Sequence, residues 1–264
     1  MDREREIYIG ENGLEHCSAC KEPVEEFFPE SVQKLFGRKT HLRFCACRRE
    51  EHEREEREHQ QEVEKNIAIC FLERAMREWC FTNDDVSNPY MKYAKLYVEY
   101  WDEVKRKGMG MLLWGDVGTG KSYMAACIAN ALLEQEKRVL MTNFTTISNG
   151  VFAAMDKNDY IESVCAYDLL ILDDLGSERN SGFVVENVLS VLDRRVCSGK
   201  PMIITMNLTV KEMSETQNLD YKRIYDRVLG SCQPICIKGE SHRREKGNKN
   251  KRAFEQIFRD EESE

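Results

Sequence analysis

The sequence lacks any long hydrophobic segment. No run of about 18 or more apolar residues, the length of a membrane-spanning helix, occurs in its 264 residues. The opening stretch, MDREREIYIG, is charged where a secretory signal peptide needs an apolar core. We therefore expect a protein that stays in the cytoplasm and does not enter a membrane.

The chain also lacks an excess of positive charge. Its formal net charge is -8, with 41% hydrophobic and 33% charged residues. This balance argues against a protein that coats nucleic acid over its whole surface, although a local basic patch can still bind a strand. The length and apolar content predict one globular core of ordinary domain size with a small appendage.

Cysteine, by contrast, is abundant, with eleven residues. Several of them, such as Cys127 and Cys165, lie in apolar contexts typical of helices or strand flanks. A reduced thiol packs there as a small hydrophobic side chain. A reducing compartment fits all eleven.

The composition divides the chain into three zones. Residues 1–47 contain two cysteine pairs, residues 48–66 contain almost only charged side chains, and apolar periodicity returns over residues 67–264. The middle zone is interpreted as a linker that is either a solvated helix or disordered. From residue 108 to residue 237, short β-like runs alternate with helical stretches, which predicts an α/β domain with a parallel sheet.

The amino-terminal zone offers four thiolate ligands. A CxxC pair is followed, after 24 residues, by a CxC pair, and four thiolates are a set that structural tetrahedral Zn²⁺ prefers. A segment of this size with few aliphatic side chains can hardly fold without a metal. We therefore predict a zinc module in which His16 or His41 could replace one of the cysteine ligands. The alternative to a zinc module is four free thiols. The candidate ligands are Cys17, Cys20, Cys45 and Cys47.

A phosphate-binding loop follows the β-like run from Met111 to Trp114. The run leads into the P-loop pattern GxxxxGKS and then into an alanine- and leucine-rich helix, which is the context that this motif requires. The glycines let backbone N–H groups turn toward phosphate oxygens. Lys121 is expected to reach the β- and γ-phosphates, and Ser122 to ligate Mg²⁺. The predicted ATP-binding residues are Gly115, Asp116, Val117, Gly118, Thr119, Gly120, Lys121, Ser122 and Tyr123.

Two carboxylates end the next buried run. Residues Leu169–Leu172 predict a central parallel strand, and ligands bind at the carboxyl end of such strands. Asp173 is expected to hold Mg²⁺ and Asp174 to polarise the attacking water, with a pair of acids capping a turn before Gly176 as the alternative. A third run, PMIITMN, ends in Asn207. Its amide is predicted to position the same water from the tip of a strand between the first two.

Taken in chain order, the P-loop, LLILDDLG, SGKPMIITMNLT, RIYDRVL and GESHRR resemble the AAA+ ATPases of the DnaC/DnaI-type replicative helicase loaders, with the IstB transposition ATPase as a close relative. The resemblance covers roughly residues 90–245 and implies an AAA+ P-loop core of three layers, αβα. Asp174 stands where many AAA+ proteins carry glutamate, which leaves the identity of the general base open. The residues that the resemblance assigns are Asn207 (sensor 1), Arg227 (arginine finger), Arg223 (its helical neighbour) and Arg243 (sensor 2, which contacts ATP).

The resemblance also implies a way of assembling. An arginine such as Arg227, on a helix after the sensor-1 strand, resembles one that enters the ATP site of the next subunit. Such a contact is heterologous, so it implies head-to-tail self-assembly as a ring or an open helix. The alternative for Arg223 and Arg227 is a solvated, charged helix face.

Three further segments carry expectations about partners. The resemblance implies that the zinc module grips a replicative helicase hexamer and that residues 143–164 supply a helix lining a channel for single-stranded DNA. Ordinary packing of Val151, Phe152 and Met155 is the alternative for that segment. Between Lys238 and Arg252, seven basic residues outnumber two acidic ones, so this tail either contacts DNA phosphates or is solvated.

These features together predict an ATP-dependent loader of a replicative helicase onto single-stranded DNA, with ATP, Mg²⁺ and Zn²⁺ as cofactors. One alternative is an IstB-like ATPase that assists a transposase, a class that generally lacks the zinc module. Another is an adaptor in which ATP sets the conformation and turnover is negligible.

Overall fold

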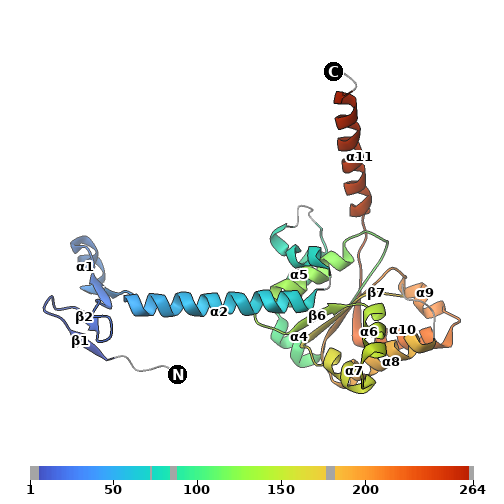
Figure 1. Ribbon diagram of the computed structural model, residues 1–264, viewed down its shortest axis with the longest axis horizontal. Helices are drawn as coiled ribbons and strands as arrows, with labels where there is room; N and C mark the ends of the chain where they lie inside the picture. Colours follow the sequence, from blue (N-terminus) through green and yellow to red (C-terminus); the bar gives the residue numbers. More distant parts are fainter. Residues whose placement is uncertain (1–5, 72, 84–87, 177–181, 262–264) are drawn as a thin grey trace. The chain divides into compact units, whose positions relative to one another are not determined.

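The computed structural model describes residues 6–71, 73–83, 88–176 and 182–261. The first residues of the predicted zinc module (1–5) and the last residues of the tail (262–264) lie outside this description. The chain divides into two compact units, Met1–Glu62 and Val63–Glu264. Helix α2 (Ala46–Cys70) begins in the first unit and ends in the second (Figure 1).

The charged zone 48–66 is helical along its whole length, as part of α2. Ion pairs between side chains one turn apart support it, for example Arg54 with Glu58 and Glu53 with Arg57. Val63 and Cys70, near the end of the helix, are buried. Of the two alternatives for this zone, helix and disorder, the helix is therefore confirmed.

The first unit is built from short elements and very little core. Two antiparallel strand pairs and one short helix make up its regular structure before α2. Among the residues of this unit whose burial is described, the buried apolar side chains are Leu14, Cys17 and Cys45. Apolar burial on this scale is too small to hold a fold by itself. The elements are β1 (Ile7–Ile9), β2 (Glu15–Cys17), β3 (Glu25–Phe27), α1 (Glu30–Phe36) and β4 (Thr40–Leu42).

The second unit contains a five-stranded sheet in the order β6-β7-β8-β5-β9, and every pairing in it is parallel. The predicted α/β class with a parallel sheet is thus confirmed. The strand after SGK lies between the two others that carry motifs, also as predicted. The strands are β5 (Gly110–Trp114), β6 (Val139–Thr142), β7 (Leu169–Leu175), β8 (Met202–Met206) and β9 (Cys232–Cys236).

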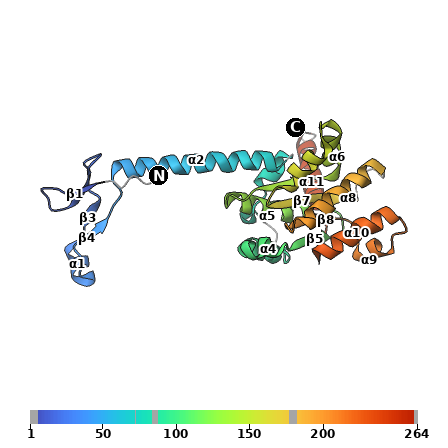
Figure 2. The same ribbon diagram turned by 90° about the horizontal axis from the view of Figure 1, so that it is seen from below.

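Helices cover both faces of the sheet and give the three predicted layers. Successive residues of β5 point to opposite faces: Met111 and Leu113 join one apolar core with α3, α4 and α5, and Leu112 joins another with α6, α7, α8 and α10. In both views, α4 and α5 lie on one side of the sheet, and α6, α8 and α10 lie on the other (Figures 1 and 2). The helices are η1 (Arg74–Glu78), η2 (Phe81–Asn83), α3 (Met91–Glu99), α4 (Trp101–Lys107), α5 (Lys121–Glu134), α6 (Phe144–Ala153), α7 (Lys157–Cys165), α8 (Gly182–Cys197), α9 (Val210–Glu215), α10 (Leu219–Ser231) and α11 (His242–Glu261).

The topology brings the polar motifs to one edge. Because β5, β7 and β8 are adjacent and parallel, their carboxyl ends meet at the same side of the sheet. The phosphate loop, the acid pair and Asn207 all follow those ends, where ligands bind in open parallel sheets. Within the part of the chain that the structure describes, no helix combines the length and apolar character needed to cross a membrane.

Candidate nucleotide site and metal centre

The phosphate loop requires glycine at two positions for reasons of space and backbone angle. Gly115 and Gly118 have φ values of 136° and 86°, which side chains disfavour. A Cβ on Gly115 would lie 2.3 Å from the Ile237 carbonyl oxygen, and one on Gly118 would lie 2.1 Å from Ser241 Oγ. The loop is therefore packed closely against the segment that leads into α11.

Lys121, the first residue of α5, lies inside this loop and is only 6% exposed. Its Nζ donates to the carbonyl oxygens of Gly115, at 2.9 Å, and Asp116, at 2.7 Å. Burial lowers the pKa of Lys121, while the charge of Asp174 acts in the opposite direction. The ammonium is thus held over the loop by two neutral acceptors, which phosphate oxygens can replace.

The predicted sensor 2, Arg243, comes to the same loop. The backbone N–H of His242 donates to the Gly118 carbonyl oxygen at 3.0 Å and ties the start of α11 to the loop. Arg243 is the next residue and is exposed. Its positive charge contributes to the lowered pKa of Lys121, so the two cations lie within electrostatic range of each other.

Two other residues of the predicted ATP set have different surroundings. Ser122 is half-buried in the first turn of α5, next to Lys121. The Tyr123 hydroxyl donates to the Cys80 carbonyl oxygen at 3.0 Å, and its ring packs 5.5 Å from that of Trp79. The side chain of Tyr123 therefore anchors the segment between η1 and η2 to α5.

The acid pair is held by the neighbouring strand β8. Asn207 Nδ2 donates to Asp174 Oδ1 at 2.7 Å, which joins the predicted sensor 1 to the predicted general base. Thr205 Oγ1 donates to Asp173 Oδ1 at 2.6 Å and accepts from the Asp174 backbone N–H at 2.8 Å. Asp174 itself has a φ of 58°, in the left-handed region.

Thr205 is a member of this group that the motif analysis missed. It is 1% exposed and lies in the middle of an apolar strand, where a threonine is easily taken for a core residue. The available signal was its spacing: Thr205 lies two residues before Asn207, which directly follows β8, and residues two apart in an extended chain tend to face the same side. Thr205 and Asn207 both contact the acid pair for this reason.

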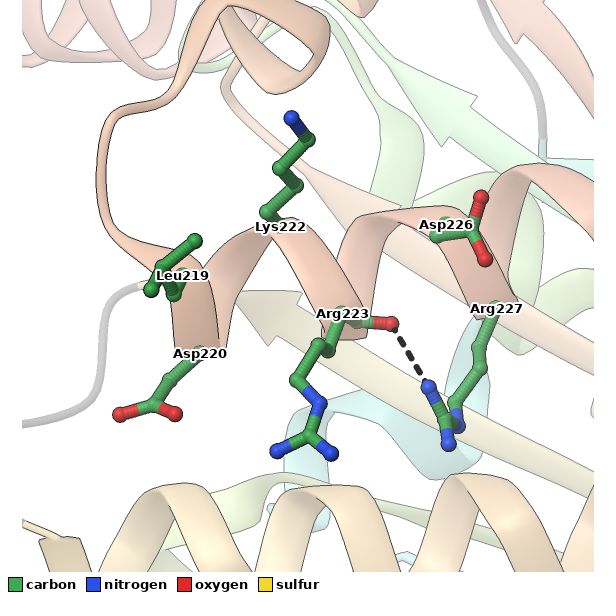
Figure 3. Close-up of a pocket in the computed structure, with 6 residues that line it drawn as sticks. All are labelled: Leu219, Asp220, Lys222, Arg223, Asp226 and Arg227. Carbon is green, nitrogen blue, oxygen red and sulfur yellow. Dashed lines mark hydrogen bonds between the residues drawn. The ribbon is translucent and has the colours of Figure 1, made fainter.

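The two predicted arginines lie on α10 and point to the same side of it, away from Lys222 (Figure 3). Together with acidic neighbours they line a shallow hollow of about 510 Å³. Arg227 Nε and Nη2 donate to the carboxylate of Asp193 on α8, and Nη1 donates to the Arg223 carbonyl oxygen at 3.2 Å. This hydrogen-bonded ion pair with Asp193 raises the pKa of Arg227.

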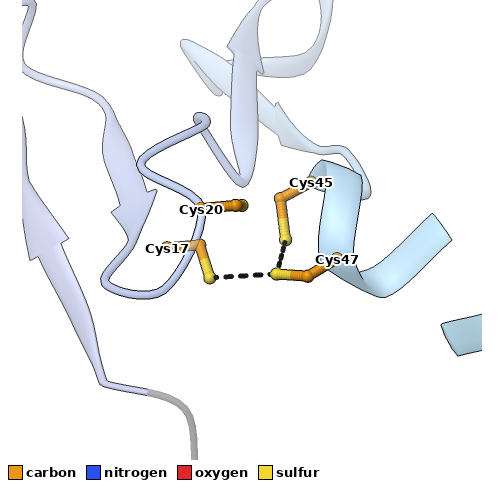
Figure 4. Close-up of side chains that lie close together, drawn as sticks. All are labelled: Cys17, Cys20, Cys45 and Cys47. Carbon is orange, nitrogen blue, oxygen red and sulfur yellow. Dashed lines mark hydrogen bonds between the residues drawn. The ribbon is translucent and has the colours of Figure 1, made fainter. Parts of the chain in front are cut away.

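The four amino-terminal cysteines converge. Cys17 ends β2, and Cys45 and Cys47 lie at the start of α2. All four sulfurs are within 4.8 Å of one another, and the Sγ of Cys47 lies 3.6 Å from those of both Cys17 and Cys45 (Figure 4). Zn–S bonds of about 2.3 Å in a tetrahedron place sulfurs about 3.8 Å apart. All four thiols are free, so the arrangement fits one zinc ion and not two disulfides.

The electrostatics of these thiols also fit a cation. Backbone N–H groups of Cys20 and Ala19 lower the pKa of Cys17, and that of Cys47 lowers the pKa of Cys20 to about 6. Hydrogen bonds with the neighbouring cysteines raise the pKa of Cys47 to about 12, and the bond with Cys20 has the largest effect. Thiolates are the form in which cysteine binds Zn²⁺, so the lowered pKa values of Cys17 and Cys20 agree with a metal site.

The two histidines proposed as substitutes lie outside the sulfur group. Both ring nitrogens of His16 have other partners, the Lys21 carbonyl oxygen at 2.8 Å and Asn12 Oδ1 at 3.0 Å. His41 Nδ1 lies 3.3 Å from the Leu42 carbonyl oxygen. Among the described residues, the donor set for the metal is therefore the four cysteines.

The segment between β6 and β7 forms α6 and α7. Val151 is buried in the apolar core, in agreement with the alternative of ordinary packing. Phe152 is 85% exposed, and Met155, in the turn after α6, is fully exposed. Core packing therefore accounts for Val151 but not for Phe152 or Met155.

Among known proteins, the chain is similar to replicative helicase loaders. The chain is 24% identical to the replicative helicase loader DnaI of Bacillus subtilis (strain 168) over 251 residues, which is 86% of this chain and 78% of DnaI. It is 28% identical to the replicative helicase loader DnaC of Escherichia coli (strain K12), over 57% of this chain and 61% of DnaC. A crystal structure of DnaI has the same fold, with a TM-score of 0.56 and 22% identity over 67% of this chain and 98% of that one.

A family model extends the comparison over most of the chain. The model of the IstB-like ATP binding proteins matches residues 33–251. That span includes the phosphate loop, the acid pair, Thr205, Asn207 and the arginines of α10. The chain therefore belongs to the IstB-like ATP-binding family, with DnaI- and DnaC-type helicase loaders among its homologues.

Proposed function

We propose that this protein is an ATP-dependent loader that places a replicative DNA helicase hexamer onto single-stranded DNA in the cytoplasm. The observation that carries the proposal is the extent of the similarity to DnaI. Its 86% share of the chain is more than the second unit makes up by itself, so it reaches into the amino-terminal unit. The four-cysteine amino-terminal unit disfavours the transposase-assisting alternative, because that class generally lacks a zinc module, whereas a loader needs a part that grips the helicase.

Each residue at the carboxyl edge of the sheet has a role in this proposal. Lys121 and the loop N–H groups bind the β- and γ-phosphates of ATP. Ser122 and Asp173 hold Mg²⁺, which when bound neutralises charge on the phosphates. Asp174 polarises the attacking water, and Asn207 orients it through the carboxylate to which it is hydrogen bonded.

The two cations on other elements complete the site. Arg243, beside the loop, contacts the phosphates of its own subunit. Arg227 of α10 acts in trans on the γ-phosphate of the next subunit, with Arg223 as the second candidate. The planar guanidinium suits the charge that develops during hydrolysis. An arginine finger that acts on the next subunit implies head-to-tail assembly of the loader.

Single-stranded DNA is the third partner in the proposal. Phe152 and Met155 offer exposed apolar side chains, and aromatic rings of this kind stack on unpaired bases. The basic stretch in the first half of α11 is suited to phosphates. Both features are local, which agrees with a protein whose net charge is -8.

The proposal is tested by loading. The full chain is mixed with the replicative helicase of its own cell and circular single-stranded DNA, with ATP or without nucleotide. We expect helicase to be retained on the circle, and to unwind an annealed strand, only when loader and ATP are both present. Loading that is no better with the loader than without it would contradict the proposal and favour a role with a transposase.

The zinc module makes a separate prediction. The purified full chain is expected to contain about one zinc per chain. The variants Cys17→Ser and Cys45→Ser are each expected to lose both the zinc and helicase binding. The reason is that the described apolar core of this unit is too small to hold the fold without the metal. ATP binding by the second unit should survive. Elemental analysis and helicase pull-down measure this, with exposed Cys197→Ser as the matched control. Metal-free protein after purification without chelator would rule the module out.

A further inference from the structure

Strands β7 and β8 change register at the acid pair. Leu172 pairs with Ile204 and Leu175 pairs with Met206, with a shift between them. Two residues of β7, Asp173 and Asp174, therefore face one residue of β8, which is the definition of a β-bulge. That one residue is Thr205.

The bulge explains how two consecutive acids can serve one site. In a regular strand, consecutive side chains point to opposite faces, so one carboxylate would be directed away from the nucleotide. The left-handed φ of 58° at Asp174 breaks this alternation. L-residues other than glycine rarely adopt that region, although aspartate is among those that tolerate it.

A single hydroxyl holds both residues of the bulge. Thr205 Oγ1 donates to Asp173 Oδ1 at 2.6 Å and accepts from the Asp174 N–H at 2.8 Å. The first bond occupies one oxygen of Asp173 and leaves Oδ2 for other partners. The second provides an acceptor for a backbone N–H that has left the regular ladder. The side chain is 1% exposed, so water cannot easily replace it.

We propose that Thr205 is the positioning residue for both acids of the ATP site. It orients Asp173 so that Oδ2 would be available to hold Mg²⁺, and it fixes the backbone turn that brings the Asp174 carboxylate to Asn207. The inference rests on the proposed function, since Mg²⁺ and hydrolysis belong to that proposal. Thr205 acts through the two aspartates to which its hydroxyl is hydrogen bonded.

The test compares Thr205→Val, which keeps the branched shape and removes the hydroxyl, with Thr205→Ser, which keeps the hydroxyl and removes a methyl group. For Thr205→Val we expect kcat to fall about 10- to 100-fold and half-saturating Mg²⁺ to rise about tenfold, as for other residues that orient metal ligands. ATP affinity measured in EDTA should stay within about twofold, because the phosphate loop is untouched. Thr205→Ser should stay within about threefold of the wild type throughout.

A second readout separates this inference from the proposed function. Mg²⁺ enhancement of the affinity for a fluorescent, non-hydrolysable ATP analogue is measured in the full chain, and Thr205→Val should lose most of it. If the wild type binds the analogue with Mg²⁺ enhancement but hydrolyses no ATP, the proposed function fails while the binding result still decides the role of Thr205.

Two outcomes would overturn the inference. One is a Thr205→Val protein with wild-type Mg²⁺ dependence in both assays. The other is an equal loss in Thr205→Ser, since that would mean shape and packing matter and the hydroxyl does not. Should Thr205→Val not fold, as judged by its thermal unfolding, Thr205→Ala replaces it under the same criteria. A double variant with Asp173→Asn should lose little more Mg²⁺ enhancement than Asp173→Asn alone, because Thr205 acts through that carboxylate.

Discussion

Replacing Lys121 with alanine is expected to abolish tight ATP binding. The ammonium lies inside the phosphate loop with two neutral carbonyl partners, and in the proposed function charged phosphate oxygens replace these partners when ATP binds. Hydrogen bonds between charged groups contribute about 1.5 to 3 kcal/mol each. Losing contacts to both the β- and the γ-phosphate should therefore weaken ATP binding about a hundredfold or more.

The fold should survive this change, although Lys121 is buried. Within the described residues, the ammonium of Lys121 donates to two carbonyls of the loop, so its loss should act mainly on the loop and should cost about 1 to 2 kcal/mol of unfolding free energy. Titration with a fluorescent ATP analogue and thermal unfolding measure the two effects separately. Exposed Lys211→Ala, on α9, makes the same charge change outside the loop and is the control. Unchanged affinity in Lys121→Ala would remove the loop from the proposed site.

Much of the nucleotide site could be predicted because its parts are local in sequence. The phosphate loop needs only a strand, a glycine-rich turn and a helix start in succession, and all three are continuous between Gly110 and Glu134. The position of Asn207 also followed, since a polar residue that ends a buried parallel strand lies at the ligand-binding edge. The order of the strands agreed with this reasoning.

The contacts that could not be predicted depend on register or on distant partners. The bulge at Asp173 and Asp174 exists only in the pairing of β7 with β8, and no local pattern in LLILDDL indicates it. The partner of Arg227 is Asp193, which lies 34 residues earlier on another helix. Periodicity places residues on a face of their own helix, but it does not say which residue of a neighbouring helix they meet.

The ion pair between Arg227 and Asp193 bears on the proposed role of Arg227 in trans. Arg227 is 32% exposed and Asp193 is 50% exposed, so solvent screens the pair and it can open without much loss. In an assembled loader, the guanidinium would exchange the carboxylate of its own chain for the γ-phosphate of the next subunit. The ion pair therefore describes where Arg227 rests in a single chain and is compatible with a role in trans.

Arg227→Ala is expected to bind ATP almost normally and to hydrolyse it about 10³- to 10⁵-fold more slowly, because the lost contact forms mainly in the transition state. Mixing it with Lys121→Ala should restore part of the activity. The Arg227→Ala subunit keeps an intact phosphate loop, and the Lys121→Ala subunit supplies the arginine. Arg223→Ala, on the same side of α10, is the matched control and should lose less activity. If Arg223→Ala shows the larger loss and the same rescue, the finger is Arg223.

The decisive measurement is the ATPase rate of the mixture against the sum of its two components. It is made on single-stranded DNA, under conditions where wild-type subunits demonstrably assemble. A residue that acts within its own subunit cannot be rescued by a neighbour, because no single chain in the mixture then has both an intact loop and the arginine. A mixture no faster than that sum would therefore exclude action in trans. Arg223 and Arg227 would then form a charged face of α10, held to α8 by Asp193.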